Sequence, residues 1–291
     1  MKAPGIGKWR SVEAHQRFVE MEDELWREHW LHPPDAFDVE SFAGTTRVYR
    51  WAGEGQPVVF LHGMGGTGLT WSLYVERLAG WDVYAIDTIG DVGRSDQREV
   101  IADASGLATW LDETLAGAGL DRAHLVGTSY GGFLALNAAA RTPQRVASLT
   151  LIDSGGLAPF RLGRFMLWGM PMLLGSLAPA SIRRWLARTR PMLEDPRVMR
   201  MALHAQRNHP FRLPTAEPLT DDQLRSISAQ TAAIVAEKSA PFASQVQAAR
   251  ARLIPKADVV VISGARHEVS WTHPDECVAL LKHVAATADR S

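Results

Sequence analysis

The amino-acid sequence predicts an α/β fold, with a mostly parallel central sheet, helices on both faces and a helical cap inserted after the sixth strand. Three observations support this prediction. Short apolar runs alternate with longer segments of helical pattern, which is typical of parallel sheets with helical crossovers. This alternation stops near residue 156 and resumes near residue 231. A G-x-S-x-G motif stands between a buried apolar run and a helix.

Residues 1–156 are expected to form the first part of the core. Residues 9–30 carry apolar side chains at helical spacing, which predicts an amphipathic helix. Two antiparallel strands are expected next, with Gly44 at their turn, and after them strands and helices alternate. Strands are expected at residues 37–42, 46–51, 57–61, 83–86 and 146–152, and the apolar run of Leu125 and Val126 is expected to be a further strand that ends at Gly127. Helices are expected at residues 69–78, 102–115 and 133–140.

Residues 157–225 are predicted to form the cap, and residues 226–291 the second part of the core. The cap segment is rich in Met, Trp, Leu, Pro and Arg and has no strand signal. Its apolar side chains are expected to cover the functional edge of the sheet and to line an apolar pocket. They are Phe160, Phe165, Met166, Leu167, Trp168, Met170, Met172, Leu173 and Trp185. After the cap, strands are expected at residues 231–236 and 259–263, and helices at 244–253 and 275–286.

Composition excludes several classes of protein. The net charge of −1 and the pI of about 6.8 give no case for nucleic-acid binding. The single cysteine, Cys277, cannot form an internal disulfide, and we interpret it as a buried small residue. The N-terminal stretch lacks an apolar core of signal-peptide length, and no run approaches the ~18 apolar residues of a membrane span. We therefore expect a cytoplasmic protein without membrane contact.

The motif Gly127-Thr128-Ser129-Tyr130-Gly131 predicts a nucleophilic serine. A sharp turn between strand and helix lifts Ser129 out of the sheet, and only small neighbours, here Gly127 and Gly131, allow so tight a turn. The backbone amide of Tyr130 is expected to point into the same space as an oxyanion donor. The alternative interpretation is an ordinary turn between a strand and a helix.

A serine hydroxyl needs a base beside it, and His267 is the candidate. It follows the last predicted strand, in a loop at the carboxyl edge where α/β sheets place their sites. His62 also lies in a site loop, but we expect it to brace that loop. The other histidines are interpreted as surface or packing residues: His15, His29, His32, His124, His204, His209, His273 and His283.

At these motifs the sequence resembles the α/β-hydrolase superfamily, and within it the small bacterial carboxylesterase-like serine hydrolases. The segments HGMGG, DTIGDVGRS and GTSYGG, a helical cap and a late histidine arrive in the order of that superfamily. The resemblance covers residue 45 to the end of the chain. It implies an oxyanion hole made of the backbone amides of Met64 and Tyr130.

The third residue of a triad departs from the superfamily pattern. The resemblance implies an acid three residues after a glycine at the end of the seventh strand, where this chain has Ser239. Glu237 stands two residues earlier, and Asp153 ends the sixth strand. We expect Asp153 to orient His267, with Glu237 as the alternative acid and a site without an acid as the remaining possibility. Asp87 and Asp91 are interpreted as residues that brace a loop.

The cap carries an unusual charge. Residues 157–219 contain ten arginines, no lysine and three acids, a net charge of +7 that leaves −8 for the rest of the chain. One interpretation is a solvated helical face. The other is a docking surface for an anionic substrate or an acidic carrier protein.

These observations predict a serine hydrolase that cleaves an ester, thioester or lactone of a small to medium substrate through an acyl-enzyme on Ser129. The alternatives are a non-hydrolytic reaction in the same pocket, such as cyclisation or carbon–carbon cleavage, and a binding or receptor-like module with residual hydrolysis. No ligand-spaced His or Cys cluster occurs, so we expect no metal and no organic cofactor. The sequence indicates no oligomeric state.

Overall fold

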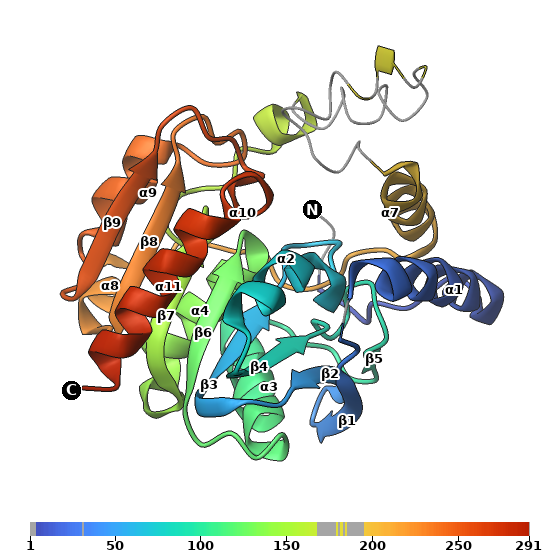
Figure 1. Cartoon of the computed structure of the whole chain (residues 1–291), viewed down its shortest axis with the longest axis horizontal. Helices are drawn as coiled ribbons and strands as arrows, with labels where there is room; N and C mark the ends of the chain where they lie inside the picture. Colours follow the sequence, from blue (N-terminus) through green and yellow to red (C-terminus); the bar gives the residue numbers. More distant parts are fainter. Residues whose placement is uncertain are drawn as a thin grey trace.

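A computed structural model describes residues 4–30, 32–167, 179, 181, 182, 184 and 195–290 of the chain. The described residues form one nine-stranded sheet of order β1-β2-β4-β3-β6-β7-β8-β9, with β5 paired to β2 (Figure 1). The strands are β1 (Asp35–Ser41), β2 (Gly44–Trp51), β3 (Glu54–Leu61), β4 (Trp81–Ile86), β5 (Asp96–Gln97), β6 (Ala123–Thr128), β7 (Val146–Ile152), β8 (Gln230–Ala236) and β9 (Ala257–Ile262).

The sheet is mostly parallel, as predicted. Strand β3 pairs in parallel with β4 and β6, and the parallel pairing continues through β7 and β8 to β9. The antiparallel pairs lie at one edge of the described sheet, where β2 pairs with β1, β4 and β5. The carboxyl ends of the parallel strands therefore meet along one edge, where the loops after β3, β6, β7, β8 and β9 come together.

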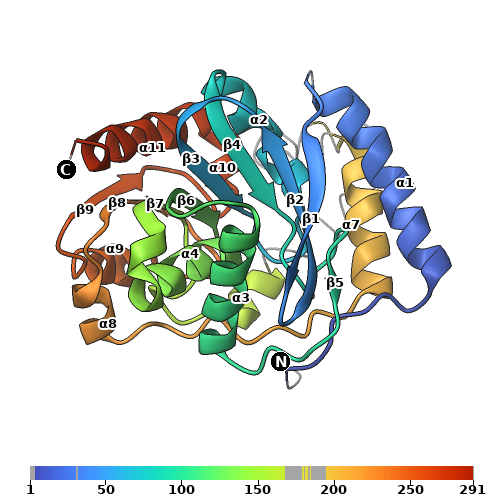
Figure 2. The same cartoon turned by 90° about the horizontal axis from the view of Figure 1, so that it is seen from below.

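Helices cover both faces of the sheet, with α2 and α11 on one face and α3, α4 and α9 on the other (Figure 2). The helical elements are α1 (Val12–His29), η1 (Gly68–Trp71), α2 (Ser72–Val75), η2 (Glu76–Leu78), α3 (Ala104–Gly117), α4 (Tyr130–Arg141), η3 (Pro143–Arg145), α7 (Pro196–Asn208), α8 (Asp221–Ser226), α9 (Ser244–Ala251), α10 (Val269–Thr272) and α11 (Pro274–Ala288).

Alternation along β3 explains why the core has two halves. Val59 and Leu61 lie in the apolar cluster that includes side chains of α3 and α4. Val58 and Phe60 lie in the second cluster, which includes side chains of α2 and α11. Successive strand residues point to opposite faces, so a strand with helices on both sides must be apolar throughout.

The structure differs from the sequence prediction in three short elements. The helix expected at residues 69–78 is three pieces, η1, α2 and η2, in which Trp71 and Tyr74 are both buried against Phe60. A spacing of three residues fits a 3₁₀ turn better than an α-helix. Strand β5 and helix α10 are too short for a periodic pattern to reveal. Because β5 adds one strand, the strand before the predicted cap is the seventh rather than the sixth.

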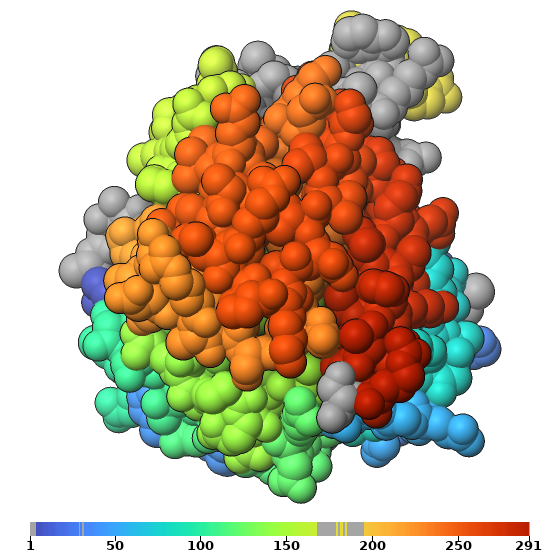
Figure 3. Space-filling model, turned by 90° about the vertical axis from the view of Figure 1, so that its left-hand side faces the viewer, coloured from blue at the N-terminus to red at the C-terminus, as the bar shows by residue number. Residues whose placement is uncertain are grey.

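Between β7 and β8, the described residues contain no strand; they include a helix at residues 162–167, then α7 and α8. Helix α7 packs against α1, which the sequence assigned to the first part of the core. The predicted division into core and cap remains a prediction. In Figure 3 the orange to red residues of the C-terminal part of the chain cover most of the upper half of this face, and green residues lie below them. No helix in the described part of the chain has the length and apolar character needed to span a bilayer.

Candidate active site

Ser129 lies at the apex of the turn between β6 and α4, with a φ of 52°. This left-handed backbone is strained for a non-glycine residue, and such strain is concentrated at functional sites. The turn is packed against its neighbours. A Cβ at Gly127 would lie 2.2 Å from the carbonyl oxygen of Gly131, and a Cβ at Gly131 would lie 2.0 Å from that of Leu61. Only glycine fits either position, as the motif predicted.

The structure brings Ser129, His267 and Asp153 together from three loops far apart in the sequence. Nε2 of His267 lies 3.1 Å from Oγ of Ser129, and Nδ1 lies 2.6 Å from Oδ2 of Asp153. Asp153 is fully buried, whereas the His267 side chain is 11% exposed and Ser129 is partly buried. The loops after β6, β7 and β9 supply the three residues, because the carboxyl ends of these strands share one sheet edge.

The two contacts of the imidazole suit one of its neutral tautomers. When Nδ1 of His267 carries the proton, it donates to the Asp153 carboxylate. Nε2 is then an acceptor, and the Ser129 hydroxyl donates to it. This tautomer is the one in which the histidine can take a proton from the serine.

Asp153 is held by four bonds around its carboxylate and backbone. Its φ is 40°, its N–H donates to the Ile234 carbonyl, and Oδ1 accepts from the N–H of Ala236 at 3.3 Å. The Ser239 hydroxyl donates to Oδ2 at 2.6 Å, the same oxygen that contacts His267. Ser239 therefore lies beside the carboxylate rather than in place of it. The sequence prediction missed this contact, although the position of Ser239 just beyond β8 placed it at the site edge.

Glu237, the alternative acid, does not contact His267. Its carboxylate is exposed and accepts from the N–H of Gly264 at 2.7 Å and from the Ser263 hydroxyl at 3.3 Å. These two bonds hold the pKa of Glu237 below its usual value, the Gly264 amide contributing most. Strand alternation explains the difference, because Glu237 leaves β8 on the side away from the imidazole.

The two expected oxyanion donors lie beside Ser129. Tyr130 is the first residue of α4, and helix geometry leaves the first N–H groups without an intrahelical acceptor. Met64 lines the same pocket as Ser129, and a Cβ at Gly63 would lie 3.3 Å from the Ser129 Cβ. Residues 62–66 therefore approach the serine closely, and the role of the Met64 and Tyr130 amides as oxyanion donors remains a prediction.

The loop of residues 62–66 is braced by buried polar side chains, as expected for His62, Asp87 and Asp91. Nδ1 of His62 donates to the Gly63 carbonyl, and Nε2 accepts from the N–H of Thr88, so both ring nitrogens are occupied. His62 is thereby excluded as the base for Ser129.

The carboxylates of Asp87 and Asp91 hold the backbone in this loop and just after it. Oδ1 of Asp87 accepts from the N–H of Gly68 at 2.8 Å, and Oδ2 of Asp91 accepts from that of Gly65 at 2.9 Å. Burial raises the pKa of Asp91 to about 6. Both aspartates thus act on the backbone of the loop, in line with the sequence interpretation.

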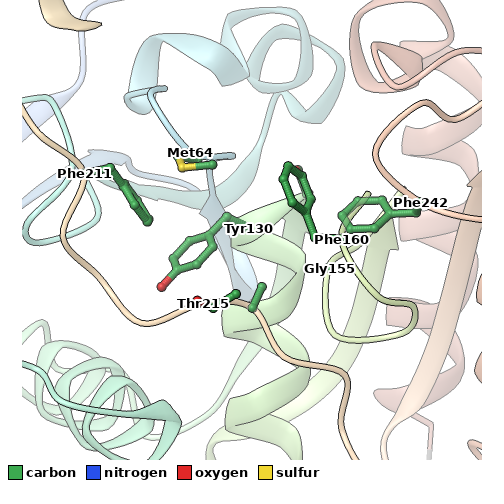
Figure 4. A pocket seen from close by; sticks show the side chains of 9 residues that line it. Met64, Tyr130, Gly155, Phe160, Phe211, Thr215 and Phe242 are labelled. Carbon is green, nitrogen blue, oxygen red and sulfur yellow. The ribbon is translucent and has the colours of Figure 1, made fainter. Parts of the chain in front are cut away.

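Ser129 opens into a narrow, mostly apolar pocket with a cavity volume of about 40 Å³. Figure 4 shows Phe160 and Phe242 on one side of Tyr130 and Phe211 on the other. The Phe242 ring is 5.8 Å from the His267 ring at 70°, an edge contact that holds the imidazole. The lining residues are Met64, Ser129, Tyr130, Gly155, Phe160, Phe211, Thr215, Ala216 and Phe242.

The structure tests the predicted cap contacts only in part. Phe160 lines the pocket, and the Phe165 ring is 6.4 Å from the His267 ring. Met166 and Leu167 are exposed rather than facing the pocket. Trp168, Met170, Met172, Leu173 and Trp185 lie outside the described residues.

One arginine of the predicted cap, Arg197, forms ion pairs with acidic residues of this chain. Arg197 pairs with Asp195 at 2.6 Å and with Glu28 of α1 at 2.5 Å, so its charge is balanced within the chain. Docking of an anionic substrate or an acidic carrier at this segment remains a prediction. In the described part of the chain, no group of three His, Cys, Asp or Glu side chains is arranged to hold a metal ion.

Cys277 is fully buried in α11, and burial raises the pKa of its thiol to about 12. At pH 8 only about one thiol in 10⁴ is then ionised, and the thiolate is the reactive form. We expect Ellman's reagent to leave the native protein unlabelled and to titrate one thiol per chain in guanidinium chloride. Rapid labelling of the native protein at pH 8 would contradict this assignment.

A family model described as "Alpha/beta hydrolase family" matches residues 58–280. The 2-hydroxy-6-oxo-6-phenylhexa-2,4-dienoate hydrolase of Comamonas testosteroni is 33% identical over 142 residues, 46% of this chain and 48% of that protein. The chain thus spans about half the length of this curated relative.

Two further comparisons cover nearly the whole chain. Carboxylesterase YbfK of Bacillus subtilis is 25% identical over 284 residues, 92% of this chain and 93% of that protein. The crystal structure of the same carboxylesterase, also called CesB, superposes with a TM-score of 0.78 at 23% identity and covers 94% of this chain and 98% of that one. The superposition shows that the two chains share a fold.

Proposed function

Because this chain belongs to the alpha/beta hydrolase family, we propose that it is a serine hydrolase acting on an ester, thioester or lactone of small to medium size. The observation that carries the proposal is the line of contacts from Ser129 through His267 to Asp153. A serine hydroxyl is activated when a base accepts its proton and a carboxylate orients that base. The similarity to a carboxylesterase over nearly the whole chain supports an ester as the substrate.

In the proposed reaction, Oγ of Ser129 attacks the substrate carbonyl carbon while its proton passes to Nε2 of His267. The oxyanion forms beside the backbone amides of Met64 and Tyr130. Collapse of this intermediate breaks the bond to the leaving group, which takes the proton from His267. Water, deprotonated by the same nitrogen, then attacks the acyl-enzyme and releases the acid with Ser129 restored.

The size of the pocket leads to an expectation about the acyl group. Phe160, Phe211 and Phe242 surround the space next to Ser129, so short or compact acyl chains should be accommodated better than long lipid chains. We expect kcat/KM for p-nitrophenyl esters to be highest between acetate and butyrate and to fall towards palmitate. A maximum at palmitate would contradict the expected pocket, and no turnover of any ester, thioester or lactone would contradict the proposed function.

A second candidate reaction is carbon–carbon bond cleavage in the same pocket. The relative from Comamonas testosteroni is named for a 6-oxo-dienoate, a compound without an ester bond. The same serine and histidine can attack or protonate such a substrate. Product analysis with esters, lactones and oxo-dienoates in one panel distinguishes this reaction from ester hydrolysis.

A further inference from the structure

We propose that residues 5–10, here called the N-terminal strap, position Phe211 and so determine which acyl groups fit beside Ser129. This inference rests on the proposed function, because it concerns the specificity of the same site. No residue of the strap lines the pocket beside Ser129, so the strap acts through the pocket wall that it holds.

Two backbone hydrogen bonds join the strap to residues 208–212, one on either side of Phe211. The N–H of Gly5 donates to the Arg212 carbonyl at 3.0 Å, and the N–H of Arg10 donates to the Asn208 carbonyl at 2.8 Å. One bond follows Phe211 directly and the other precedes it by three residues. The backbone that carries the Phe211 ring is therefore fixed at both ends by the strap.

The strap is in turn held against the core. The N–H of Gly7 donates to Oε1 of Gln97 at 2.7 Å in a buried position. A Cβ at Gly7 would lie 2.1 Å from the carbonyl oxygen of Gly90, which follows β4. Because no side chain fits between Gly7 and Gly90, the strap lies directly on the loop that follows β4. Residues 208–212 bond to the strap in this position.

The Trp9 ring of the strap packs between aromatic side chains of α1 and His209. Its ring stacks on His15 at 5.3 Å, lies 4.9 Å from the Phe18 ring, and makes an edge contact with His209 at 5.1 Å. His209 precedes Phe211 by two residues and is buried. Burial lowers the pKa of His209 to about 4, so its ring is neutral at working pH and packs as part of an apolar cluster.

Phe211 connects this cluster to the active site. Its ring meets the Tyr130 ring at 5.3 Å and 89°, and the Tyr130 hydroxyl donates to the Pro214 carbonyl at 2.8 Å. Tyr130 is fixed by α4 directly after Ser129. Tyr130 and Phe211 are therefore in contact as one part of the pocket lining, and the place of the Phe211 ring in it is determined by where the strap holds residues 208–212.

The test measures acyl selectivity, as the ratio of kcat/KM for p-nitrophenyl benzoate to that for the acetate. Trp9→Ala removes the ring that packs against His209, so we expect the ratio to rise. The expected rise is about tenfold, the lower end of what one methylene changes in an apolar pocket, and most of it should come from a change in KM. Phe211→Ala removes the wall itself and should raise the ratio similarly. Trp9→Phe should keep the wild-type ratio, because its aromatic ring can still pack against His209. Arg17→Ala, at an exposed position of the neighbouring helix α1, should also leave the ratio unchanged.

A double-mutant cycle decides whether Trp9 acts through Phe211. The double variant should raise the ratio no further than either single change, since both remove the same constraint. If the double variant raises the ratio by the product of the two single effects, Trp9 does not act through Phe211 and the inference is wrong. An unchanged ratio in Trp9→Ala contradicts the inference as well.

If Trp9→Ala does not fold, Gly7→Ala takes its place, because its methyl group lifts the strap from Gly90. If the wild type hydrolyses esters but the variants have an unchanged ratio, the role of the strap is contradicted and the proposed function is not. Absence of any turnover by the wild type contradicts the proposed function as well.

Discussion

Replacing Ser129 with alanine should lower the turnover of p-nitrophenyl acetate or butyrate about 10⁶-fold without unfolding the protein. The hydroxyl is the only side-chain atom lost, and alanine keeps the Cβ that packs near Gly63. The residual rate would come from the backbone donors and from substrate binding. Initial rates and far-UV circular dichroism measure the two parts of this expectation, and a fluorophosphonate probe should label the wild type but not the variant.

Ser148→Ala is a matched control, because Ser148 is buried in the adjacent strand β7 and bonds to His124 rather than to the site. It should keep its activity and its probe labelling. If Ser129→Ala retains most of the activity, Ser129 is not the nucleophile, and the proposed mechanism is wrong even if the protein hydrolyses esters.

Asp153→Asn is expected to have the second-largest effect and to lower the rate about 10⁴-fold. An asparagine has one acceptor oxygen where the carboxylate has two. If that oxygen faces His267 and Ser239, its NH2 group meets the N–H of Ala236, and if it faces Ala236, the NH2 group meets Nδ1–H of His267, so the imidazole is no longer held with its proton on Nδ1. Glu237→Gln makes the same chemical change at an exposed carboxylate that bonds to Gly264, and it should alter the rate by no more than a few-fold. Steady-state kinetics of the two variants, with matched melting temperatures, separate the two candidate acids.

Ser239 refines this test. Ser239→Ala removes one donor to Asp153 and should lower the rate far less than Asp153→Asn. If Asp153→Asn is nearly as active as the wild type while Glu237→Gln is not, the acid is assigned to the wrong residue. If neither amide matters and Ser239→Asp raises the rate, His267 works without an acid, and a binding role with residual hydrolysis gains support.

Much of the fold could be predicted because each long element carries its own periodic signal. The parallel strands lie within about three residues of their expected positions, since β6, β7 and the second half of β3 are buried on both faces and are mostly apolar. Elements of two to four residues, such as β5 and α10, were missed because their conformation comes from contacts with distant segments. The broken helix at residues 68–78 was missed for the same reason.

By itself, the sequence determined the fold class, the strained turn at Ser129 and the identity of His267 as its neighbour. Each of these depends on local pattern: glycines at fixed spacing, an apolar run before a turn, and a histidine just past a strand. Only the tertiary structure decided which carboxylate reaches His267, because Asp153 and Glu237 both follow parallel strands and differ in the direction that their side chains leave the sheet. The bond from Ser239 to Asp153 and the strap that holds Phe211 likewise join residues about 86 and 200 positions apart, and no local pattern encodes such contacts.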